Sequence, residues 1–296
     1  MSSLVIDKFK VNLSNLDKVF WPKHNYTKGD MIDYYINIYP YMKNYLKNRP
    51  VSLKIYPDGI GGKYFFQKNA PDYAPYWLTV NAIYSQHRKE PINWILINKL
   101  SDLVWVTNKA SIELHSWFST VKNLEKPSFA VFDLDPDDKS SFTNVIQVAL
   151  NIKKVLEELR LDSYIKTSGK SGLHIYLPLQ EKYSYTAVKI FLKSVSEVVI
   201  KMNPDLATIE WRKKNREGKV YIDYRQNGQG KTLPAPYTLR PTTEATVSTP
   251  LNWQELNSDV SPDDFTIKNI QQRLQDKGDI WADLLSNKQE LPDFFL

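Results

Sequence analysis

Apolar and polar positions alternate along this chain in a pattern that predicts strands and helices in regular succession after residue 129. Short apolar runs of strand length precede longer stretches whose apolar residues recur at helical spacing. The expected strands cover residues 129–132, 163–166, 173–177 and 220–224, and the expected helices cover about 143–160 and about 184–202. Such alternation predicts an α+β or α/β core with functional groups at strand ends.

The first 125 residues follow a less regular pattern. Thr27 is placed to cap a helix with apolar residues at helical spacing, and Pro40 is expected to kink or restart this helix. Further on we expect strands and then a helix, over residues 51–56, 63–66, 94–97 and 99–109. Near the end of the chain, four prolines predict an extended segment before a helical tail that contains Ile267, Ile270, Leu274 and Ile280.

Composition indicates a folded chain without disulfide or zinc-finger chemistry. Of 296 residues, 42% are hydrophobic and 13% aromatic, which is enough to bury a large core. Cysteine is absent. No stretch approaches the roughly 18 apolar residues of a membrane span, and the N-terminus has no long apolar segment. We therefore expect a soluble, cytoplasmic protein with no membrane partner.

The net charge of +6 weakly favours a polyanionic partner. The stretch from Arg225 to Arg240 is rich in hydrogen-bond donors, including Gln226 and Lys231, and no acidic residue follows before Glu244. Such a stretch suits a triphosphate or a template backbone. A solvated basic loop explains any single residue of this stretch almost as well.

Two aspartates follow the apolar run 129–132. Asp133 and Asp135 are two residues apart, so on a strand both carboxylates project from the same face. Carboxylates that close repel each other unless a cation lies between them, and hard oxygen ligands suit a divalent metal. Asp223 ends another short strand and would complete a two-metal site. The alternatives are a turn acid pair and an ordinary aspartate at a strand end.

A turn rich in glycine and hydroxyl groups joins two expected strands at residues 168–172. Its backbone amides are expected to form a nest for an anion, with His174 reaching toward it from the second strand. A P-loop is excluded, because Tyr164 stands where that motif requires glycine and a strand follows the turn. A tight structural hairpin and a structural histidine are the alternatives.

Together these segments resemble the polymerase domain of bacterial ATP-dependent DNA ligase D, the non-homologous end-joining branch of the archaeo-eukaryotic primase superfamily. The resemblance covers nearly the whole chain in order, and the joint occurrence of its pieces is highly specific. It is carried by residues 16–22, 27–30, 49–50, 65–68, 113–115, 132–136, 167–169, 172–174, 223–227, 231–232 and 236–240.

The resemblance implies an α+β, primase-type catalytic core over residues 1–296. An RRM-like sheet and a flanking α/β lobe would surround a central active-site cleft. We expect an N-terminal lobe at about 1–125, the catalytic sheet at about 126–250 and a C-terminal helical tail at about 251–296.

The resemblance also implies roles for particular residues. Asp133, Asp135 and Asp223 would be catalytic and bind two Mn²⁺ or Mg²⁺ ions. The nucleotide, an NTP or dNTP, would be bound by His115, Ser168, Lys170, Ser171, His174, Arg240, Phe66, Lys54, Gln226 and Lys231. DNA would contact Phe65, Arg225 and Arg216, and its 5′-phosphate would contact Lys18 and Lys28.

Two departures from the family pattern bear on these roles. Relatives often carry Ser-Lys in the glycine turn, whereas this chain has Lys170 followed by Ser171. The lysine would then approach the phosphates from a different angle. Relatives often have two basic residues after the Arg-Pro pair, whereas here Lys54 is followed by Ile55, so one contact to phosphate or template would be missing.

The expected activity is template-dependent nucleotide addition that fills gaps and extends ends during repair of DNA double-strand breaks by non-homologous end joining. Ribonucleotides would be preferred, the reaction would use two metal ions, and the protein would act at the nucleoid. Its DNA would have a gap or a 3′ overhang and a 5′-phosphate, and its protein partners would be Ku and a DNA ligase, fused or separate. The alternatives are a replicative or plasmid primase and a non-catalytic nucleic-acid-binding module.

Lys18 and Lys28 distinguish gap repair from de novo priming, which needs no 5′-phosphate pocket. A lysine at a helix N-terminus is slightly unfavourable unless an anion is drawn to the same end. A terminal phosphate carries close to two negative charges. Two lysines acting with helix amides would therefore select a 5′-phosphate, whereas the alternative is two ordinary exposed lysines.

Overall fold

The structure is a computed structural model, and it describes residues 2–292. The chain divides into two compact units, which are described separately. Unit 1 comprises Met1–Lys122, Thr232–Val247 and Thr266–Asp276. Unit 2 comprises Asn123–Lys231, Ser248–Phe265 and Lys277–Leu296. No helix among residues 2–292 has the length and apolar character needed to cross a membrane.

Unit 2 is built on a six-stranded sheet with the order β13-β14-β10-β12-β11-β16. Its main elements follow the chain as β10 (Phe129–Pro136), α3 (Phe142–Glu158), β11 (Tyr164–Thr167), β12 (Leu173–Pro178), α4 (Tyr185–Met202) and β14 (Val220–Asp223). The short edge strands are β13 (Ala207–Thr208) and β16 (Pro250–Leu251). Each neighbouring pair among the four central strands is antiparallel, and with α3 and α4 they form the βαββαβ topology of an RRM-like sheet. The expected RRM-like sheet is confirmed.

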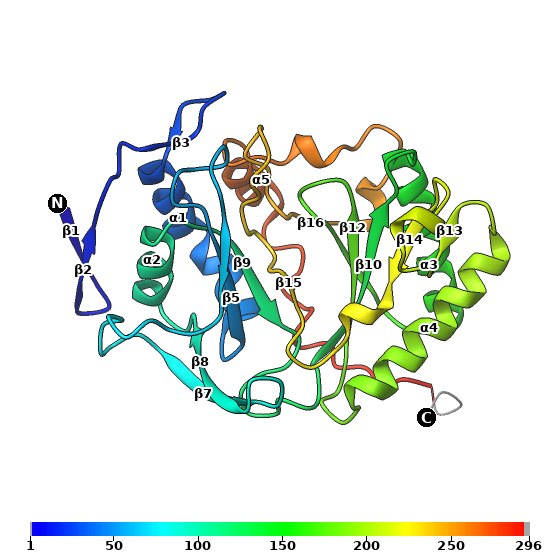
Figure 1. Cartoon of the computed structure of the whole chain (residues 1–296). Helices are drawn as coiled ribbons and strands as arrows, with labels where there is room; N and C mark the ends of the chain where they lie inside the picture. The colour runs from blue at the N-terminus through cyan, green and yellow to red at the C-terminus, as the bar shows by residue number, and fades with distance from the viewer. Residues whose placement is uncertain (1, 293–296) are drawn as a thin grey trace. The chain divides into compact units, whose positions relative to one another are not determined.

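The two faces of this sheet differ sharply in chemistry. Every second residue of β10 (Ala130, Phe132 and Leu134) belongs to one buried core with the apolar positions of α3 and α4. Figure 1 shows both helices on the same side of the sheet. The alternate residues of β10, which include Asp133 and Asp135, project from the opposite face. Burial of one face therefore leaves the other available for chemistry.

Unit 1 contains a second sheet, with the order β15-β9-β5-β8-β7 and with β6 paired to β5. Its strands are β5 (Pro50–Ile55), β6 (Phe65–Gln67), β7 (Val80–Ser85), β8 (Glu90–Leu96), β9 (Ser111–Trp117) and β15 (Thr232–Pro234). The smaller elements are the pairs β1 (Ser2–Ile6) with β2 (Phe9–Leu13) and β3 (Val19–Trp21) with β4 (Tyr26–Thr27). The helices are α1 (Lys28–Leu46), α2 (Leu100–Asn108) and α5 (Ile270–Lys277). Unit 2 also has short 3₁₀ helices, at Lys213–Asn215, Tyr224–Gln226, Trp253–Glu255 and Pro262–Asp264.

Local sequence signals explain where the helices of unit 1 begin. Thr27 Oγ1 accepts a hydrogen bond from the Asp30 amide, and the Asp30 carboxylate accepts one from the Thr27 amide, which forms a capping box. The fully buried carboxylate of Asp102 accepts hydrogen bonds from the amides of Asn98 and Lys99 at the start of α2. The expected restart at Pro40 is wrong, because α1 runs through this residue as one helix.

Candidate active site

The strand register of unit 2 brings the predicted acidic residues together on the face opposite α3 and α4. Asp133 lies directly opposite Asp223 on β14 and directly opposite His174 on β12. Asp135, two residues further along β10, projects on the same side. We call Asp133, Asp135, Asp223 and His174 the carboxylate face. It unites residues that lie far apart in the sequence.

Short contacts fix the backbone and side chains around this face. His174 Nε2 lies 3.2 Å from Asp133 Oδ1, and both side chains are largely buried. The Arg225 amide donates to Asp223 Oδ1 at 2.9 Å. The buried Asn227 bonds to the backbone N–H and C=O of Val131, which pins the turn after β14 against β10. The aspartates therefore project from a strand pair that is held on both sides.

The donor set of the carboxylate face suits a hard divalent cation. Three carboxylates supply the oxygen ligands that Mg²⁺ and Mn²⁺ prefer. As the side chains stand, no group of three or more acidic or histidine side chains within residues 2–292 has metal-binding geometry. The backbone placement and ligand chemistry fit a metal, and ligation requires the side chains to converge.

The glycine turn is shaped for close approach to β10. A Cβ at Gly172 would lie 2.1 Å from the Leu134 carbonyl oxygen, so no side chain fits there. Gly169 adopts a positive φ of 74°, which favours glycine. The amides of Lys170 and Gly172 donate to Ser168 Oγ at 3.1 and 3.0 Å. These two amides therefore face inward, and the predicted anion nest is wrong for them.

Two further basic residues lie beside the carboxylate face. Lys166 is fully buried, stands opposite His174 in the register, and contacts Ser248 Oγ. The Arg216 guanidinium lies 4.0 Å from the ring centre of Tyr221, the residue opposite Asp135. Sequence reasoning missed Lys166, although a lysine inside an apolar strand is itself a signal of a special environment.

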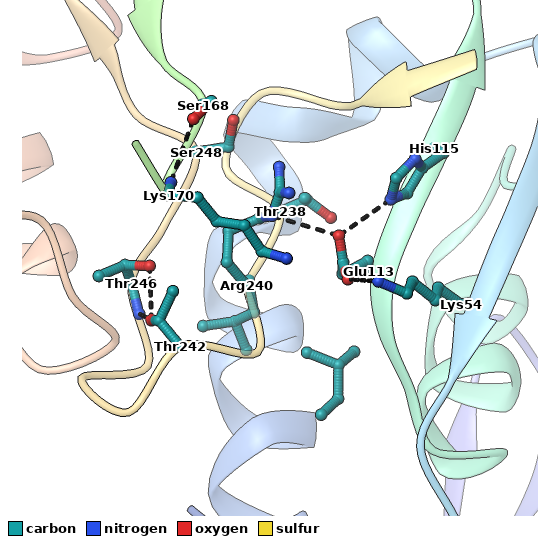
Figure 2. A network of polar contacts seen from close by, with 12 residues as sticks. Lys54, Glu113, His115, Ser168, Lys170, Thr238, Arg240, Thr242, Thr246 and Ser248 are labelled. Atoms are coloured by element: carbon teal, nitrogen blue, oxygen red, sulfur yellow. Dashed lines mark hydrogen bonds and ion pairs between the residues drawn. The ribbon is translucent and has the colours of Figure 1, made fainter. Parts of the chain in front are cut away.

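Unit 1 carries a cluster of opposite character around one buried acid. Glu113 is 1% exposed and contacts the ammonium of Lys54 at 2.9 Å, His115 Nε2 at 3.1 Å and Arg240 Nε at 3.2 Å. Tyr56 donates its hydroxyl to Glu113 Oε1 at 2.8 Å. Figure 2 shows Lys54, His115 and Arg240 gathered around this carboxylate. We call these five residues the Glu113 cluster.

Burial and charge set the protonation states in the Glu113 cluster. Burial alone would raise the pKa of Glu113, yet the hydrogen bond from His115 and the charge of Arg240 hold that pKa well below its ordinary value. Burial lowers the pKa of His115, although Glu113 opposes this shift. Neutral His115 then donates from Nε2 to Glu113 and presents Nδ1 as an acceptor.

Aromatic residues of β6 split between two sites because adjacent strand residues face opposite ways. Phe66 stands opposite Lys54, and its ring lies 6.0 Å from the His115 ring at an interplanar angle of 90°. Phe65 stands opposite Ile55 and lines a different cavity. Both phenylalanine side chains are about half exposed.

The cavity lined by Phe65 brings together the two lysines predicted to bind a 5′-phosphate. Its volume is about 280 Å³, and we call it the lysine pocket. Lys18 pairs with Asp58 at 2.6 Å, whereas Lys28 contacts the Ser14 carbonyl oxygen at 2.6 Å. Lys28 is not an ordinary exposed lysine, because it is 4% exposed.

The first amides of α1 do not point into the lysine pocket as expected. The Lys28 amide donates to the Lys18 carbonyl oxygen and the Gly29 amide donates to that of Leu16, both at 2.8 Å. The Asp30 amide donates to Thr27 Oγ1. The prediction that helix amides assist the lysines is therefore wrong, and side-chain ammonium groups supply the charge.

Residues 27–281 match the family model described as LigD, primase-polymerase domain. The chain belongs to this family. It is 36% identical to the bifunctional non-homologous end joining protein LigD of Bacillus subtilis over 96% of its length, and 33% identical to the multifunctional LigD of Mycolicibacterium smegmatis over 93%. The resemblance inferred from the sequence is confirmed.

A solved LigD structure shares the fold. The polymerase domain from Mycobacterium tuberculosis ligase D in complex with DNA superposes with a TM-score of 0.87 at 29% identity. The match covers 94% of this chain and 99% of that one. By contrast, this chain spans 45% of the Bacillus subtilis LigD and 36% of the Mycolicibacterium smegmatis LigD. The superposition on the solved polymerase domain confirms the primase-type fold class.

The remaining predicted site residues of this LigD-family chain lie near the features described. Arg225 and Gln226 lie in the 3₁₀ helix directly after Asp223, and Lys231 directly precedes β15. Lys170 and Ser171 lie in the glycine turn. Sequence reasoning named His115 but missed its partner Glu113, although their spacing of two residues on a strand signals a shared face.

Proposed function

We propose that this chain is a template-dependent nucleotidyltransferase that fills gaps and extends ends when double-strand breaks are rejoined. The observation that carries the proposal is the register that sets Asp133 against Asp223, with Asp135 on the same face. Membership in the LigD primase-polymerase family supports the same reaction.

In the proposed reaction, a primer 3′-hydroxyl attacks the α-phosphorus of a nucleoside triphosphate and pyrophosphate leaves. Asp133, Asp135 and Asp223 would hold Mn²⁺ or Mg²⁺. When bound, the two ions lower the pKa of the attacking hydroxyl and neutralise the leaving pyrophosphate. His174 orients Asp133 through their 3.2 Å contact. Ser168, Lys170, Ser171 and His174 would bind the triphosphate.

The Glu113 cluster is suited to a nucleotide. Arg240 and Lys54 carry positive charge that the single carboxylate of Glu113 cannot balance, which favours an anionic ligand. His115 Nδ1 can accept a hydrogen bond from a sugar hydroxyl, and Phe66 beside it offers a ring for a base. A site that binds a hydroxyl discriminates against a ligand that lacks one, so ribonucleotides would be preferred.

DNA would be bound at several points on this chain. Phe65, Arg225, Arg216, Gln226 and Lys231 would contact the template, primer or nucleotide. Lys18 and Lys28 would hold the 5′-phosphate across a gap, which favours gap repair over de novo priming. Ku and a DNA ligase, fused or separate, would be the protein partners, and the protein would act in the cytoplasm at the nucleoid.

Primer extension on gapped DNA tests the proposal. Asp133→Asn and Asp223→Asn should abolish nucleotide addition in the presence of Mn²⁺ while DNA binding is retained. Asp138→Asn is the matched control, because that carboxylate is exposed and pairs with Lys213. Extension by either active-site variant at the rate of the control would refute the proposed role of the carboxylate face.

A further inference from the structure

The lysine pocket contains a third cation that the sequence did not indicate. Lys109, the residue directly after α2, lines the same cavity as Lys18 and Lys28. Its own amide is occupied by carbonyl groups of the last turn of α2, so only its side chain is available to a ligand. The three lysines come from separate parts of unit 1 and meet only in the folded chain.

Charge in the lysine pocket is unbalanced. Lys18 has Asp58 as an acidic partner at 2.6 Å. The ammonium of Lys28 contacts only the neutral oxygens of Ser14, at 2.6 and 3.3 Å. Among residues 2–292, no carboxylate lies within ion-pair distance of Lys28 or Lys109. Two of three positive charges therefore lack an acid, which matches the nearly dianionic charge of a terminal phosphate.

The positive charge of Lys109 affects the pKa of Lys28. Burial, followed by the charges of Lys109 and Lys18, lowers the pKa of Lys28 to about 8. Two ammonium groups that destabilise each other are both stabilised when an anion binds between them. Lys109 and Lys28 are thus neighbours in charge as well as in position.

An exposed aromatic ring lies at the same cavity. Tyr73 lines the lysine pocket and is 65% exposed. The Lys109 ammonium lies 4.5 Å from the centre of its ring, within cation–π range. A large exposed ring beside phosphate-binding lysines is the arrangement with which proteins stack bases of a nucleic-acid strand.

We propose that Lys109 and Tyr73 bind the first nucleotide of the downstream strand, Lys109 through its 5′-phosphate and Tyr73 by stacking on its base. This inference rests on the proposed function of the lysine pocket. The pocket then reads a nucleotide and not only its phosphate.

Binding of the whole chain to three gapped duplexes tests the inference. The first carries a 5′-phosphate on the downstream strand, the second a 5′-hydroxyl, and the third a 5′-phosphate on an abasic first nucleotide. The variants are Lys109→Gln and Tyr73→Ala. Lys43→Gln is the matched control, because Lys43 is exposed and lies in the last turn of α1, away from the pocket.

Lys109→Gln should weaken binding to the 5′-phosphorylated duplex by about tenfold, the size expected for one charge-assisted contact, and should leave the 5′-hydroxyl duplex nearly unchanged. Tyr73→Ala should weaken binding to the normal phosphorylated duplex and not to the abasic one. Equal losses for Lys109→Gln on phosphate and hydroxyl ends would overturn its role. Equal losses for Tyr73→Ala on normal and abasic ends would overturn stacking.

A wrong function for the lysine pocket and a wrong role for Lys109 and Tyr73 give different binding results. If the unaltered protein binds 5′-phosphate and 5′-hydroxyl ends equally, the proposed function of the lysine pocket is wrong, and this inference is wrong with it. If it discriminates, and Lys28→Gln removes discrimination while Lys109→Gln and Tyr73→Ala retain it, only this inference is overturned. Thermal unfolding of each variant verifies that the fold is kept.

Discussion

The carboxylate face of unit 2 and the Glu113 cluster of unit 1 place ionisable side chains on sheets with opposite balances of charge. The Glu113 cluster surrounds one carboxylate with Lys54, His115 and Arg240. Its single acid therefore has several partners, and the cluster as a whole keeps a positive charge. On the carboxylate face, Asp133 and Asp223 stand directly opposite each other. The first arrangement is complete without a cation and suits an anion, whereas the second is relieved by a cation.

This difference teaches that proximity of charged residues has two separate consequences. A buried acid with several cationic partners contributes to stability, because its removal leaves those charges unpaired. Like charges held together lower stability until a ligand binds, so they are retained for function. Substitutions in the two regions should therefore have opposite effects on folding and activity.

The largest effect should come from the carboxylate face. Asp133→Asn should lower the rate of nucleotide addition by roughly a thousandfold or more, because metal ions contribute several kcal/mol to stabilising the transition state. Its stability without metal should fall little or rise, since one repelling charge is removed. Single-turnover primer extension and urea unfolding measure both. A variant that is unstable and still active would break the comparison.

The next effect concerns the folding stability of unit 1. Glu113→Gln should lower the free energy of unfolding by about 3 kcal/mol, because buried Lys54 and Arg240 lose their counter-charge. Glu113→Asp is the conservative companion and should lose less. Urea unfolding at pH 7 measures both, and an unchanged midpoint for Glu113→Gln would contradict the account.

Glu113 also gives a pH dependence with a definite sign. Its pKa is depressed in the folded state, so the unfolded chain binds more protons and the contribution is fully present only above the unfolded value of about 4.3. As pH falls below about 4.3, this stability is lost progressively. The loss between pH 5 and 3 should be smaller in Glu113→Gln, and identical slopes would contradict the depressed pKa.

A smaller effect should separate the sugar specificity of the Glu113 cluster from its stability. The ratio of kcat/KM for a ribonucleotide over its deoxy counterpart should exceed one if, as proposed, His115 Nδ1 accepts a hydrogen bond from the 2′-hydroxyl. His115→Phe should lower this ratio by about tenfold, the size of one good hydrogen bond. Gap filling with matched nucleotides measures it, and a ratio unaffected by the substitution would exclude His115 as the discriminating group.

The smallest effect is a pH dependence in the lysine pocket, where two of the three lysines have no acidic partner within the described part of the chain. Its charged and titratable groups are Lys18 with its partner Asp58, Lys28, Lys109 and Tyr73. Burial and the neighbouring lysines lower the pKa of Lys28 to about 8, so affinity for a 5′-phosphate end should fall by up to about tenfold per pH unit above pH 8. Lys109→Gln should move this fall to higher pH. A fall at the same pH in both proteins would contradict the coupling.

The sequence was most informative where periodicity and local signals agree. The apolar runs of β10 and β12, the helices α3 and α4, and the cap at Thr27 follow from short-range patterns. The spacing of Asp133 and Asp135 and their link to Asp223 came from strand geometry and resemblance, and the register of β10 and β14 agrees with both. Apart from the link to Asp223, these features need only neighbouring residues to be recognised.

Other features depended on contacts that no local pattern encodes. The strand β9 was not predicted, although its register with β5 sets Glu113 opposite Lys54. Lys109 reaches the lysine pocket only because α2 ends there. In the glycine turn, the amides of Lys170 and Gly172 donate hydrogen bonds to the Ser168 hydroxyl. In each case a contact over long sequence distance, or competition for a hydrogen bond, decided the outcome.

Mn²⁺ binding followed by thermal unfolding tests the central claim most directly, because it needs neither DNA nor nucleotide. A ligand at one hundred times its dissociation constant stabilises a protein by about 2.7 kcal/mol. We predict a shift of several degrees in Tm with Mn²⁺ for the unaltered protein and for Asp138→Asn, and almost none for Asp133→Asn or Asp223→Asn. An equal shift in all four proteins, or none in the unaltered protein, would contradict a cation site on the carboxylate face.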